Sequence, residues 1–201
     1  MIVALVPAAG ASSRMGSPKL LLPFGGAGSV LASYLGVLER GGVERLLVIV
    51  AAGDDGALAR EAGRAGAEVA TNPAPERGML SSLWAGLDAL AGDPAEALVL
   101  GPADFPALRA GTVRDLLDTV RGGAVLAVPT VDGARGHPLV VSGELASEIR
   151  GLDLALGLRQ LLDRHADELR EVAVDDPGAI LDVDDETSYR RALALARGAG
   201  R

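Results

Sequence analysis

The chain has 201 residues, of which 49% are hydrophobic, and a formal net charge of −8. This length suits one domain with a substantial core. The negative charge argues against a general nucleic-acid-binding protein, because such proteins need a basic surface. The absence of cysteine excludes disulfides, thiolate zinc sites and a cysteine nucleophile, and it suits a cytoplasmic protein. With no apolar run near the ~20 residues of a membrane span and no signal-peptide pattern at the start, we expect no membrane association.

Short apolar runs alternate with amphipathic patterns along the chain. In chain order we predict a strand at 2–6, a helix at 29–40, a strand at 45–51, a helix at 54–65, a strand at 68–71, a helix at 81–90, a strand at 97–100, a helix at 112–121, a strand at 124–129, a strand at 137–142, a helix at 154–166, a strand at 169–174 and a helix at 186–197.

The predicted strands are continuous apolar runs, as in a sheet that helices cover on both faces. Their alternation with helices predicts an α/β fold with a doubly wound, mostly parallel sheet. The rhythm changes after Pro129, and we interpret the remainder as a mixed-sheet extension of the same domain. The domain is predicted to cover 1–197, with 198–201 as a frayed tail.

The single lysine of the chain, Lys19, follows a loop of small residues after the first predicted strand, whereas the other 18 basic residues are arginines. Lysine is a compact point charge and arginine a bulkier planar fork, so the two are not interchangeable in a tight turn. The alternative is a solvated loop lysine. We favour a site that needs an ammonium group, and we expect phosphate oxygens as its partners.

The loop before Lys19 contains Gly10, Ser12, Ser13 and Gly16, together with Arg14. In an α/β sheet, ligands bind beyond the carboxyl end of the first strand, and backbone N–H groups between small residues can close around phosphate. The order of residues fits neither the nucleoside-triphosphatase P-loop nor the dinucleotide motif G-x-G-x-x-G. A purely structural glycine turn is the alternative, but the cations favour phosphate binding.

Three carboxylates follow predicted strands and are candidate metal ligands. Asp104 comes after the strand at 97–100, while Asp182 and Asp184 are alternate residues of a late segment, so both can face one ion. Mg²⁺ prefers a few hard oxygens together with substrate phosphates and water. A helix cap or turn residue is the alternative for Asp104.

Other polar residues have two interpretations each. His137, between glycine and proline, forms a structural hydrogen bond or contacts the acceptor substrate, whereas His165 is interpreted as an exposed helix-end residue. Asn72, the only asparagine, recognises a base or shapes the turn before the next proline. Of Ser81 and Ser82, we expect one to cap a helix and the other to contact the nucleotide.

Five segments of the chain resemble signature motifs of the MobA-like nucleotidyltransferases, in the same order. They are Pro7-Ala8-Ala9-Gly10 with Arg14-Met15-Gly16 and Lys19; Asn72-Pro73 with Gly78-Met79, Ser82 and Gly86-Leu87; Asp104-Phe105-Pro106; Arg135-Gly136-His137-Pro138; and Asp182-Val183-Asp184 with Tyr189. The match covers most of the chain and most resembles the molybdenum-cofactor cytidylyltransferase branch.

The resemblance implies a Rossmann-like, three-layer fold of the nucleotide-diphospho-sugar transferase type. It implies transfer of a nucleoside monophosphate to a phosphorylated acceptor with Mg²⁺ and release of pyrophosphate. The loop from Ala8 through Gly16 would hold the phosphates, Lys19 and Arg14 would offset charge, and Asp104 would bind the metal, joined by Asp182 or Asp184. The Ala8-Ala9-Gly10 form of the loop implies CTP rather than GTP, with molybdopterin as acceptor and a molybdoenzyme apoprotein as a further partner.

Some residues depart from the family pattern. Pro7 replaces the usual leucine, as in the methylerythritol-phosphate cytidylyltransferases, but the other motifs of that family are absent. Asp185 and Glu186 replace a Thr-Pro pair. Alternatives are a guanylyltransferase acting on phosphoenolpyruvate or phospholactate, a family member acting as a reductase, and a non-catalytic carrier of the finished cofactor. The carboxylates and Lys19 favour catalysis, since a carrier needs no metal site.

Overall fold

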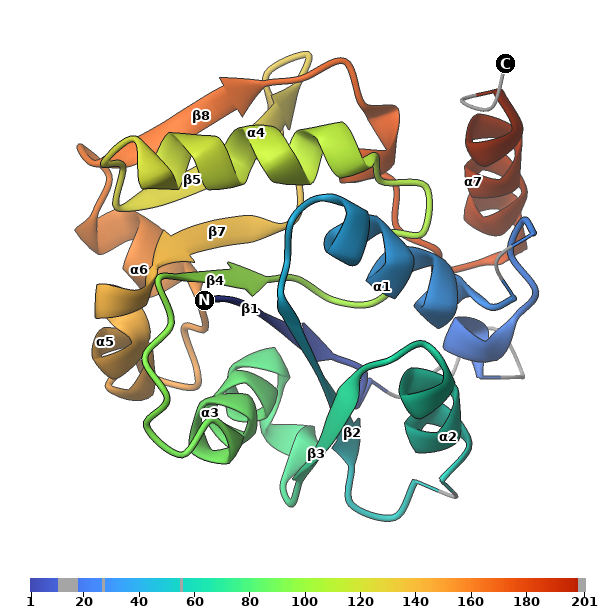
Figure 1. Ribbon diagram of the computed structural model, residues 1–201, viewed down its shortest axis with the longest axis horizontal. Helices are drawn as coiled ribbons and strands as arrows, with labels where there is room; N and C mark the ends of the chain where they lie inside the picture. Colours follow the sequence, from blue (N-terminus) through green and yellow to red (C-terminus); the bar gives the residue numbers. More distant parts are fainter. Residues whose placement is uncertain (11–17, 27, 55, 199–201) are drawn as a thin grey trace.

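The computed structural model describes residues 1–10, 18–26, 28–54 and 56–198. Within these residues eight strands form one sheet, in the order β3-β2-β1-β4-β7-β5-β6, with β8 paired to β5 (Figure 1). The strands are β1 (Ile2–Pro7), β2 (Arg45–Ala51), β3 (Glu68–Asn72), β4 (Ala97–Leu100), β5 (Leu126–Val131), β6 (Ala134–Arg135), β7 (Leu139–Ser142) and β8 (Leu169–Ala173).

The first four strands are parallel, with β1 in the middle of the sheet between β2 and β4. Leu5 of β1 is in register with Leu47 of β2 and with Leu100 of β4. The strand β7 then runs antiparallel to both β4 and β5, while β8 is parallel to β5. The predicted mostly parallel sheet with a mixed C-terminal extension is therefore confirmed.

Helices cover both faces of the sheet and make three layers (Figure 1). The α-helices of the described residues are α1 (Val30–Arg40), α2 (Ala57–Arg64), α3 (Met79–Ala89), α4 (Ala110–Arg121), α5 (Ala146–Arg150), α6 (Arg159–Arg164) and α7 (Glu186–Gly198). Short 3-10 helices are η1 (Lys19–Leu21), η2 (Pro75–Arg77), η3 (Gly143–Leu145) and η4 (Pro177–Ile180). None of the described helices is long and apolar enough to cross a membrane.

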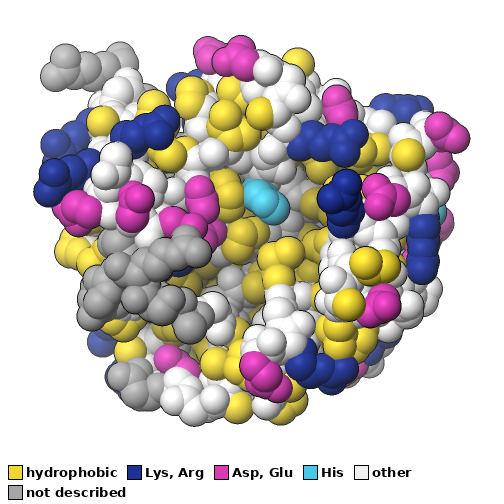
Figure 2. Space-filling model, turned by 180° about the vertical axis from the view of Figure 1, so that it is seen from behind, with side chains coloured by type: hydrophobic (Ala, Val, Ile, Leu, Met, Phe, Trp, Pro, Cys, Tyr) yellow, Lys and Arg dark blue, Asp and Glu magenta, His cyan; other side chains and the backbone are white. Residues whose placement is uncertain are grey.

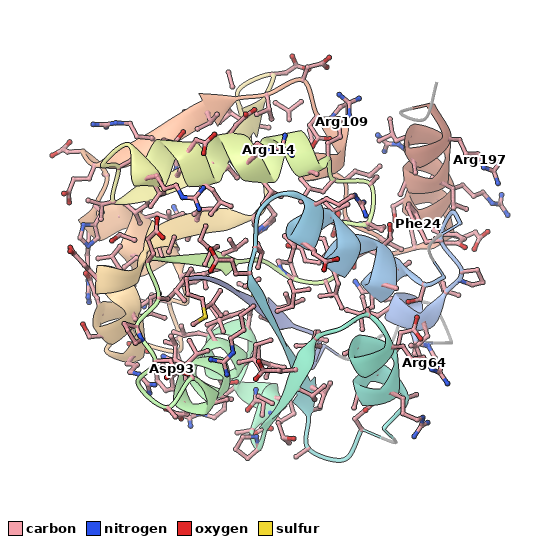
Figure 3. The ribbon with its side chains drawn as sticks, in the orientation of Figure 1. Phe24, Arg64, Asp93, Arg109, Arg114 and Arg197 are labelled. Carbon is pink, nitrogen blue, oxygen red and sulfur yellow. The ribbon has the colours of Figure 1, made fainter. Side chains whose placement is uncertain are left out.

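Two hydrophobic cores lie on opposite faces of the sheet because successive strand residues point to opposite sides. Ile2, Ala4 and Val6 of β1 pack with α1 and α4, whereas Val3 and Leu5 pack with α3. The core beside α1 extends to α7 through Phe24, which is labelled between these helices in Figure 3. The Phe24 ring lies 6.5 Å from that of Tyr189 on α7, so the last helix is anchored near the start of the chain.

The predicted helix at 154–166 is wrong in its extent. Only Arg159–Arg164 is α-helical, and the helix α5, which was not predicted, precedes it. The intervening loop is closed by Gln160, whose side-chain nitrogen donates to the carbonyls of Asp153 and Gly157 and whose oxygen accepts from the Asp153 N–H. Gly157 has a positive φ of 63°, a conformation outside the right-handed helix. These local hydrogen bonds override the helical periodicity.

Candidate active site

The candidate site lies where the carboxyl ends of β1 and β4 meet. The chain continues from β1 to β2 on one side of β1, and β4 lies on the other side. A crevice forms beyond the carboxyl ends of the strands where the connections diverge in this way. The loop after β1 begins with Ala8, whose N–H donates to the carbonyl of Ile49 in β2 at 2.8 Å. The loop after β4 leads from Gly101 to Asp104. The sheet therefore places two predicted site segments side by side.

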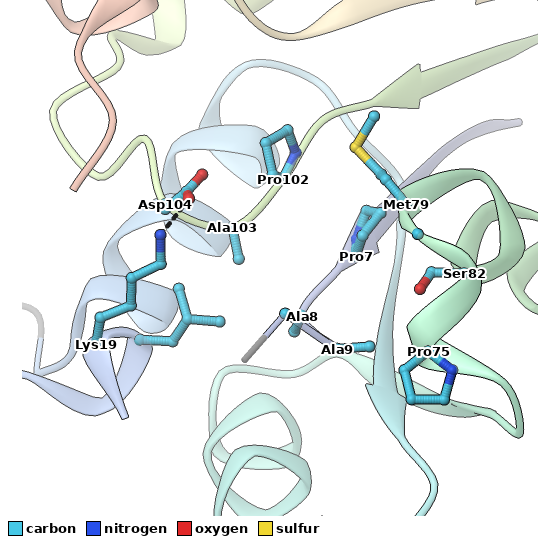
Figure 4. A pocket seen from close by; sticks show the side chains of 13 residues that line it. Pro7, Ala8, Ala9, Lys19, Pro75, Met79, Ser82, Pro102, Ala103 and Asp104 are labelled. Atoms are coloured by element: carbon cyan, nitrogen blue, oxygen red, sulfur yellow. Dashed lines mark hydrogen bonds and ion pairs between the residues drawn. The ribbon is translucent and has the colours of Figure 1, made fainter. Parts of the chain in front are cut away.

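A cavity of about 220 Å³ lies between these loops and α3 (Figure 4). Six of the residues that were predicted to bind nucleotide or metal line it, together with residues for which no role was predicted. The lining residues are Pro7, Ala8, Ala9, Gly10, Lys19, Leu20, Pro75, Gly78, Met79, Ser82, Pro102, Ala103 and Asp104. The molecule is hollowed on the face shown in Figure 2, where hydrophobic side chains line the hollow and acidic side chains border it.

Lys19 occupies the boundary between the cavity and the predicted metal ligands. Its Nζ donates to Asp104 Oδ2 and to Asp184 Oδ1, both at 2.7 Å. Burial disfavours the ammonium, but the hydrogen bonds and charges of the two carboxylates outweigh burial and raise the pKa of Lys19. Lys19 is therefore a cation held at a fixed place at one end of the cavity, as Figure 4 shows.

Asp104, Asp182 and Asp184 come together although almost eighty residues separate the first from the others. Each offers one carboxylate oxygen, and these three oxygens lie within 4.8 Å of one another. The N–H of Val183 donates to the Asp104 carbonyl at 2.9 Å, which ties the two segments together. Asp104 Oδ1 is buried and has no hydrogen-bond partner among the described residues. Three convergent carboxylate oxygens are the hard ligands that fit a divalent cation.

Part of the predicted phosphate loop lies outside the described residues. This applies to Arg14, Ser12, Ser13 and Gly16, so their predicted roles stay predictions. Within the described part, Gly10 and Lys19 lie on either side of that segment and both line the cavity.

Asn72 lies behind the cavity wall rather than on it. Its side chain is buried, its Nδ2 donates to Ser81 Oγ at 2.8 Å and to Ser82 Oγ at 2.9 Å, and its Oδ1 accepts from the Ala74 N–H. Both amide protons and the carbonyl are thus engaged inside the protein. The structure favours the turn-shaping interpretation of Asn72 over direct recognition of a base.

The two serines of α3 also differ from one another. Ser82 lines the cavity, whereas the hydroxyl of Ser81 donates to Gly78 and Ala74 carbonyls and is directed away from it. The expectation that one serine caps the helix is wrong, because the helix begins at Met79 and its N-cap is Gly78, with no side-chain hydrogen bond. Gly78 has a φ of 86°, a conformation that glycine adopts without strain.

His137 lies close to the carboxylates but is not part of the described cavity lining. The centroid of its ring lies 4.8 Å from that of Phe105, and the backbone N–H of His137 donates to the Ala179 carbonyl. The peptide bond from His137 to Pro138 is cis. Burial lowers the pKa of His137 and outweighs the opposing charges of Asp104 and Asp182. His137 is thus a neutral imidazole beside the acidic cluster.

Two parts of the site, the wall formed by Met79 and Pro75 and the buried Tyr34, had no role predicted from the sequence, although Met79 belongs to one of the family motifs. Met79 and the Pro75 turn form the cavity wall opposite Lys19 (Figure 4). Tyr34 of α1 is fully buried beneath the loop that leads to Asp104. A side chain at Gly101 would place its Cβ 2.6 Å from Tyr34 Oη, so this loop needs glycine there. An apolar helical pattern alone gives no signal that one of its residues lies beneath a site.

Comparison with known proteins shows which proteins the chain resembles over most of its length. The chain is 26% identical over 183 residues to molybdenum cofactor cytidylyltransferase of Escherichia coli K12, covering 90% of this chain and 89% of that protein. It resembles Rv0371c of Mycobacterium tuberculosis H37Rv, solved in complex with manganese, with a TM-score of 0.73, 29% identity and coverage of 96% and 98% of the two chains. It also resembles the nucleotidyl transferase Mth528 of Methanothermobacter, with a TM-score of 0.79, 22% identity and coverage of 98% and 99%.

These likenesses confirm the nucleotide-diphospho-sugar transferase fold that the sequence motifs implied. The family model of the MobA-like NTP transferase domain matches residues 4–169, which include the cavity, Lys19 and Asp104. The chain therefore belongs to the family of MobA-like NTP transferase domains.

Proposed function

We propose that the protein is a Mg²⁺-dependent cytidylyltransferase that transfers CMP from CTP to the phosphate of molybdopterin and releases pyrophosphate. The relative from Escherichia coli supports this choice of reaction. The Ala8-Ala9-Gly10 loop, which lines the cavity, supports CTP as the nucleotide. In this reaction a phosphate oxygen of the acceptor bonds to the α-phosphorus, and the bond from that phosphorus to the oxygen bridging the β-phosphate breaks.

The observation that carries the proposal is the position of Lys19 between the cavity and two carboxylates. Its ammonium is 2.7 Å from both Asp104 and Asp184, and Asp182 lies in the same cluster. One ammonium among three carboxylates leaves the cluster able to accept further positive charge, while the same ammonium can offset charge on a triphosphate. A site for metal and nucleotide together has these properties.

The donor set fits a divalent metal. Asp104, Asp182 and Asp184 would hold it through carboxylate oxygens, which Mg²⁺ prefers. When bound, the ion would neutralise charge on the triphosphate and on the departing pyrophosphate. The manganese complex of the mycobacterial relative supports a divalent ion in this fold.

Residues of this chain would position the nucleotide and offset the charge on its phosphates. Phosphoryl transfer depends mostly on positioning and on offsetting charge. Lys19, with Arg14, would offset charge on the phosphates, and Ser82 offers a hydroxyl at the cavity wall. The backbone at Gly10, Ser12, Ser13 and Gly16 would cradle the phosphates.

We place the acceptor on the side of the carboxylates where His137 lies. A neutral imidazole can donate to or accept from a polar acceptor group without adding charge. Its burial next to the Phe105 ring holds it in one orientation. His137 would therefore orient the acceptor rather than neutralise its phosphate.

The test is pyrophosphate release by the purified full-length chain with Mg²⁺, each of the four NTPs in turn, and molybdopterin. We expect release with CTP that requires both acceptor and metal. Asp104→Asn should lose this activity, whereas the matched control Asp163→Asn should keep it, because Asp163 is 72% exposed on α6 and lies outside the described cavity lining.

Two other outcomes of this assay would contradict parts of the proposal. Release with GTP instead of CTP would reassign the base. Tight binding of a finished dinucleotide cofactor without any pyrophosphate release would make the protein a carrier and overturn the proposed transfer reaction.

A further inference from the structure

Tyr34 is a side chain of α1 that lies entirely within the protein core. Its exposed fraction is 0%, and Tyr34 Oη has no hydrogen-bond partner among the described residues. Buried tyrosine hydroxyls nearly always find a partner, since an unmet hydroxyl in an apolar surrounding is destabilising. The rest of the side chain packs in the core beside α1, so the ring itself needs no further explanation.

The Tyr34 hydroxyl lies against the backbone that carries Asp104. A Cβ built on Gly101 would be 2.6 Å from Tyr34 Oη and 3.1 Å from Pro138 Cβ. The hydroxyl thus lies at the junction of α1, the loop after β4 and the His137–Pro138 segment. Burial, with the Asp104 charge, raises the pKa of Tyr34, so the phenol stays protonated and remains a donor.

The Asp104 charge acts on both Tyr34 and His137, and Asp104 and His137 each have an unpartnered polar atom among the described residues. Asp104 Oδ1 and His137 Nδ1 are buried without partners among the described residues. The other oxygen of Asp104 accepts from Lys19, so only Oδ1 remains unmet on that carboxylate. A donor on Tyr34 and an acceptor on Asp104 are complementary, and a single water satisfies such a pair when they are too far apart for a direct hydrogen bond.

We propose that Tyr34 is a positioning residue for the Asp104 carboxylate, acting through one buried water to which its hydroxyl donates and which in turn donates to Asp104 Oδ1. This inference rests on the proposed role of Asp104 as a metal ligand. Groups that hydrogen-bond to a ligating carboxylate fix its orientation, and their loss lowers metal affinity. Tyr34 is fully buried and is not among the described residues that line the cavity, so it would act on the metal only through Asp104.

The variant Tyr34→Phe separates this role from core packing, because it removes only the hydroxyl and keeps the ring. The chain contains one other tyrosine, Tyr189, whose hydroxyl donates to the Pro23 carbonyl near the surface. Tyr189→Phe is therefore the matched control. Melting temperatures without metal verify that both variants are folded.

The measurement is Mn²⁺ binding to the full-length chain, followed by electron paramagnetic resonance of the free ion. We expect Tyr34→Phe to weaken binding about tenfold or more, the usual effect of removing such a group. Tyr189→Phe should bind like the wild type. Asp104→Asn shows whether the bound ion depends on the proposed ligand.

The outcomes separate the two proposals. If wild type binds Mn²⁺ in an Asp104-dependent way and Tyr34→Phe binds equally well, the metal site stands and the role of Tyr34 is overturned. If binding does not depend on Asp104, the metal site itself fails, and the role of Tyr34 with it. A crystal structure showing an ordered water between Tyr34 Oη and Asp104 Oδ1 would support the proposal independently, and a dry gap there would overturn it.

Discussion

Lys19 Nζ and Asp104 Oδ2 lie 2.7 Å apart, and this contact joins the segment after the glycine loop to the segment after β4. Both side chains are largely buried, with 17% and 16% exposed. An ion pair shielded from water to this extent is screened less by salt than a surface pair. The contact fixes an ammonium next to the segment proposed to bind phosphate and a carboxylate next to the proposed metal.

Replacing Lys19 should impair turnover much more than folding. We expect Lys19→Ala to lower kcat roughly 10²-fold or more, the scale of losing one electrostatic stabiliser. Lys19→Arg should not restore full activity, because the planar fork cannot place one compact charge between two carboxylates. The measurement is steady-state pyrophosphate release, with Arg64→Ala as control, since Arg64 is 77% exposed on α2. Full activity in Lys19→Arg would contradict the requirement for an ammonium.

Asp104→Asn should abolish Mg²⁺-dependent turnover while the protein stays folded. The substitution removes one negative charge from a cluster of three carboxylates, which relieves repulsion and offsets the weakened pair with Lys19. The melting temperature should therefore change little, and the Asp104→Asn protein should need far more metal for any residual activity. Normal metal dependence in this variant, or a failure to fold, would assign Asp104 a structural role.

The sequence predicted the parts of the site that depend on strand order. Asp104 and Lys19 each follow a strand or its loop, and parallel strands bring such loops to one edge. The sequence could not show that Lys19 bridges Asp104 and Asp184, because that contact depends on how the late segment folds back. Ser81 and Asn72 show a different limit: their side chains hydrogen-bond one another, and no pattern distinguishes such an internal contact from one to a ligand.

The sequence also could not predict that Tyr34 lies beneath the site. Tyr34 follows the apolar periodicity of a core helix, and only the packing of α1 places its hydroxyl against Gly101, where the Asp104 charge acts on it. The helix prediction for residues 146–164 was wrong for a local reason. Gln160 engages backbone groups of the preceding loop, so hydrogen bonds of one side chain, rather than helix propensity, determine where α6 begins.

His165 should give the fold a pH-dependent contribution that is separate from catalysis. Its ring nitrogens lie 2.7 Å from Glu168 and 2.8 Å from Glu148, and hydrogen bonds to Glu168 and then Glu148 raise the pKa of His165. A raised histidine pKa contributes stability that is complete below its ordinary value of 6.5 and is lost as the pH rises through the folded value.

Glu148 sets the acidic limit of this contribution. Its hydrogen bond with His165 lowers the pKa of Glu148, so this part is present above the ordinary value of 4.5 and is lost as the pH falls through the lower, folded value. We expect His165→Ala to lower the melting temperature most between about pH 5 and 6.5 and least above the raised histidine pKa. Melting curves across pH 4–9 check this, and a difference that grows toward alkaline pH would contradict it.

Ala9 should influence the choice of base. It lines the cavity directly after β1, next to Ala8 and Gly10. Its methyl group restricts the approach of a base to the backbone, which favours a smaller pyrimidine over a purine. Steric discrimination of this kind is worth about 1–3 kcal/mol, or roughly 10–200-fold in specificity. We therefore expect CTP to be preferred over GTP, and Ala9→Gly to narrow the preference.

Competition between CTP and GTP in one reaction measures the ratio of the two kcat/KM values directly. Ala103→Gly is the matched control, because Ala103 lines the same cavity after β4 instead of β1. If the methyl group at position 9 acts on the base, Ala9→Gly should shift the ratio towards GTP while Ala103→Gly leaves it near the wild-type value. A wild-type enzyme that prefers GTP would overturn the cytidylyl assignment and leave nucleotidyl transfer in place. Equal shifts in both variants would contradict a specific role of position 9, since both substitutions remove one methyl group from the cavity wall and both increase backbone freedom.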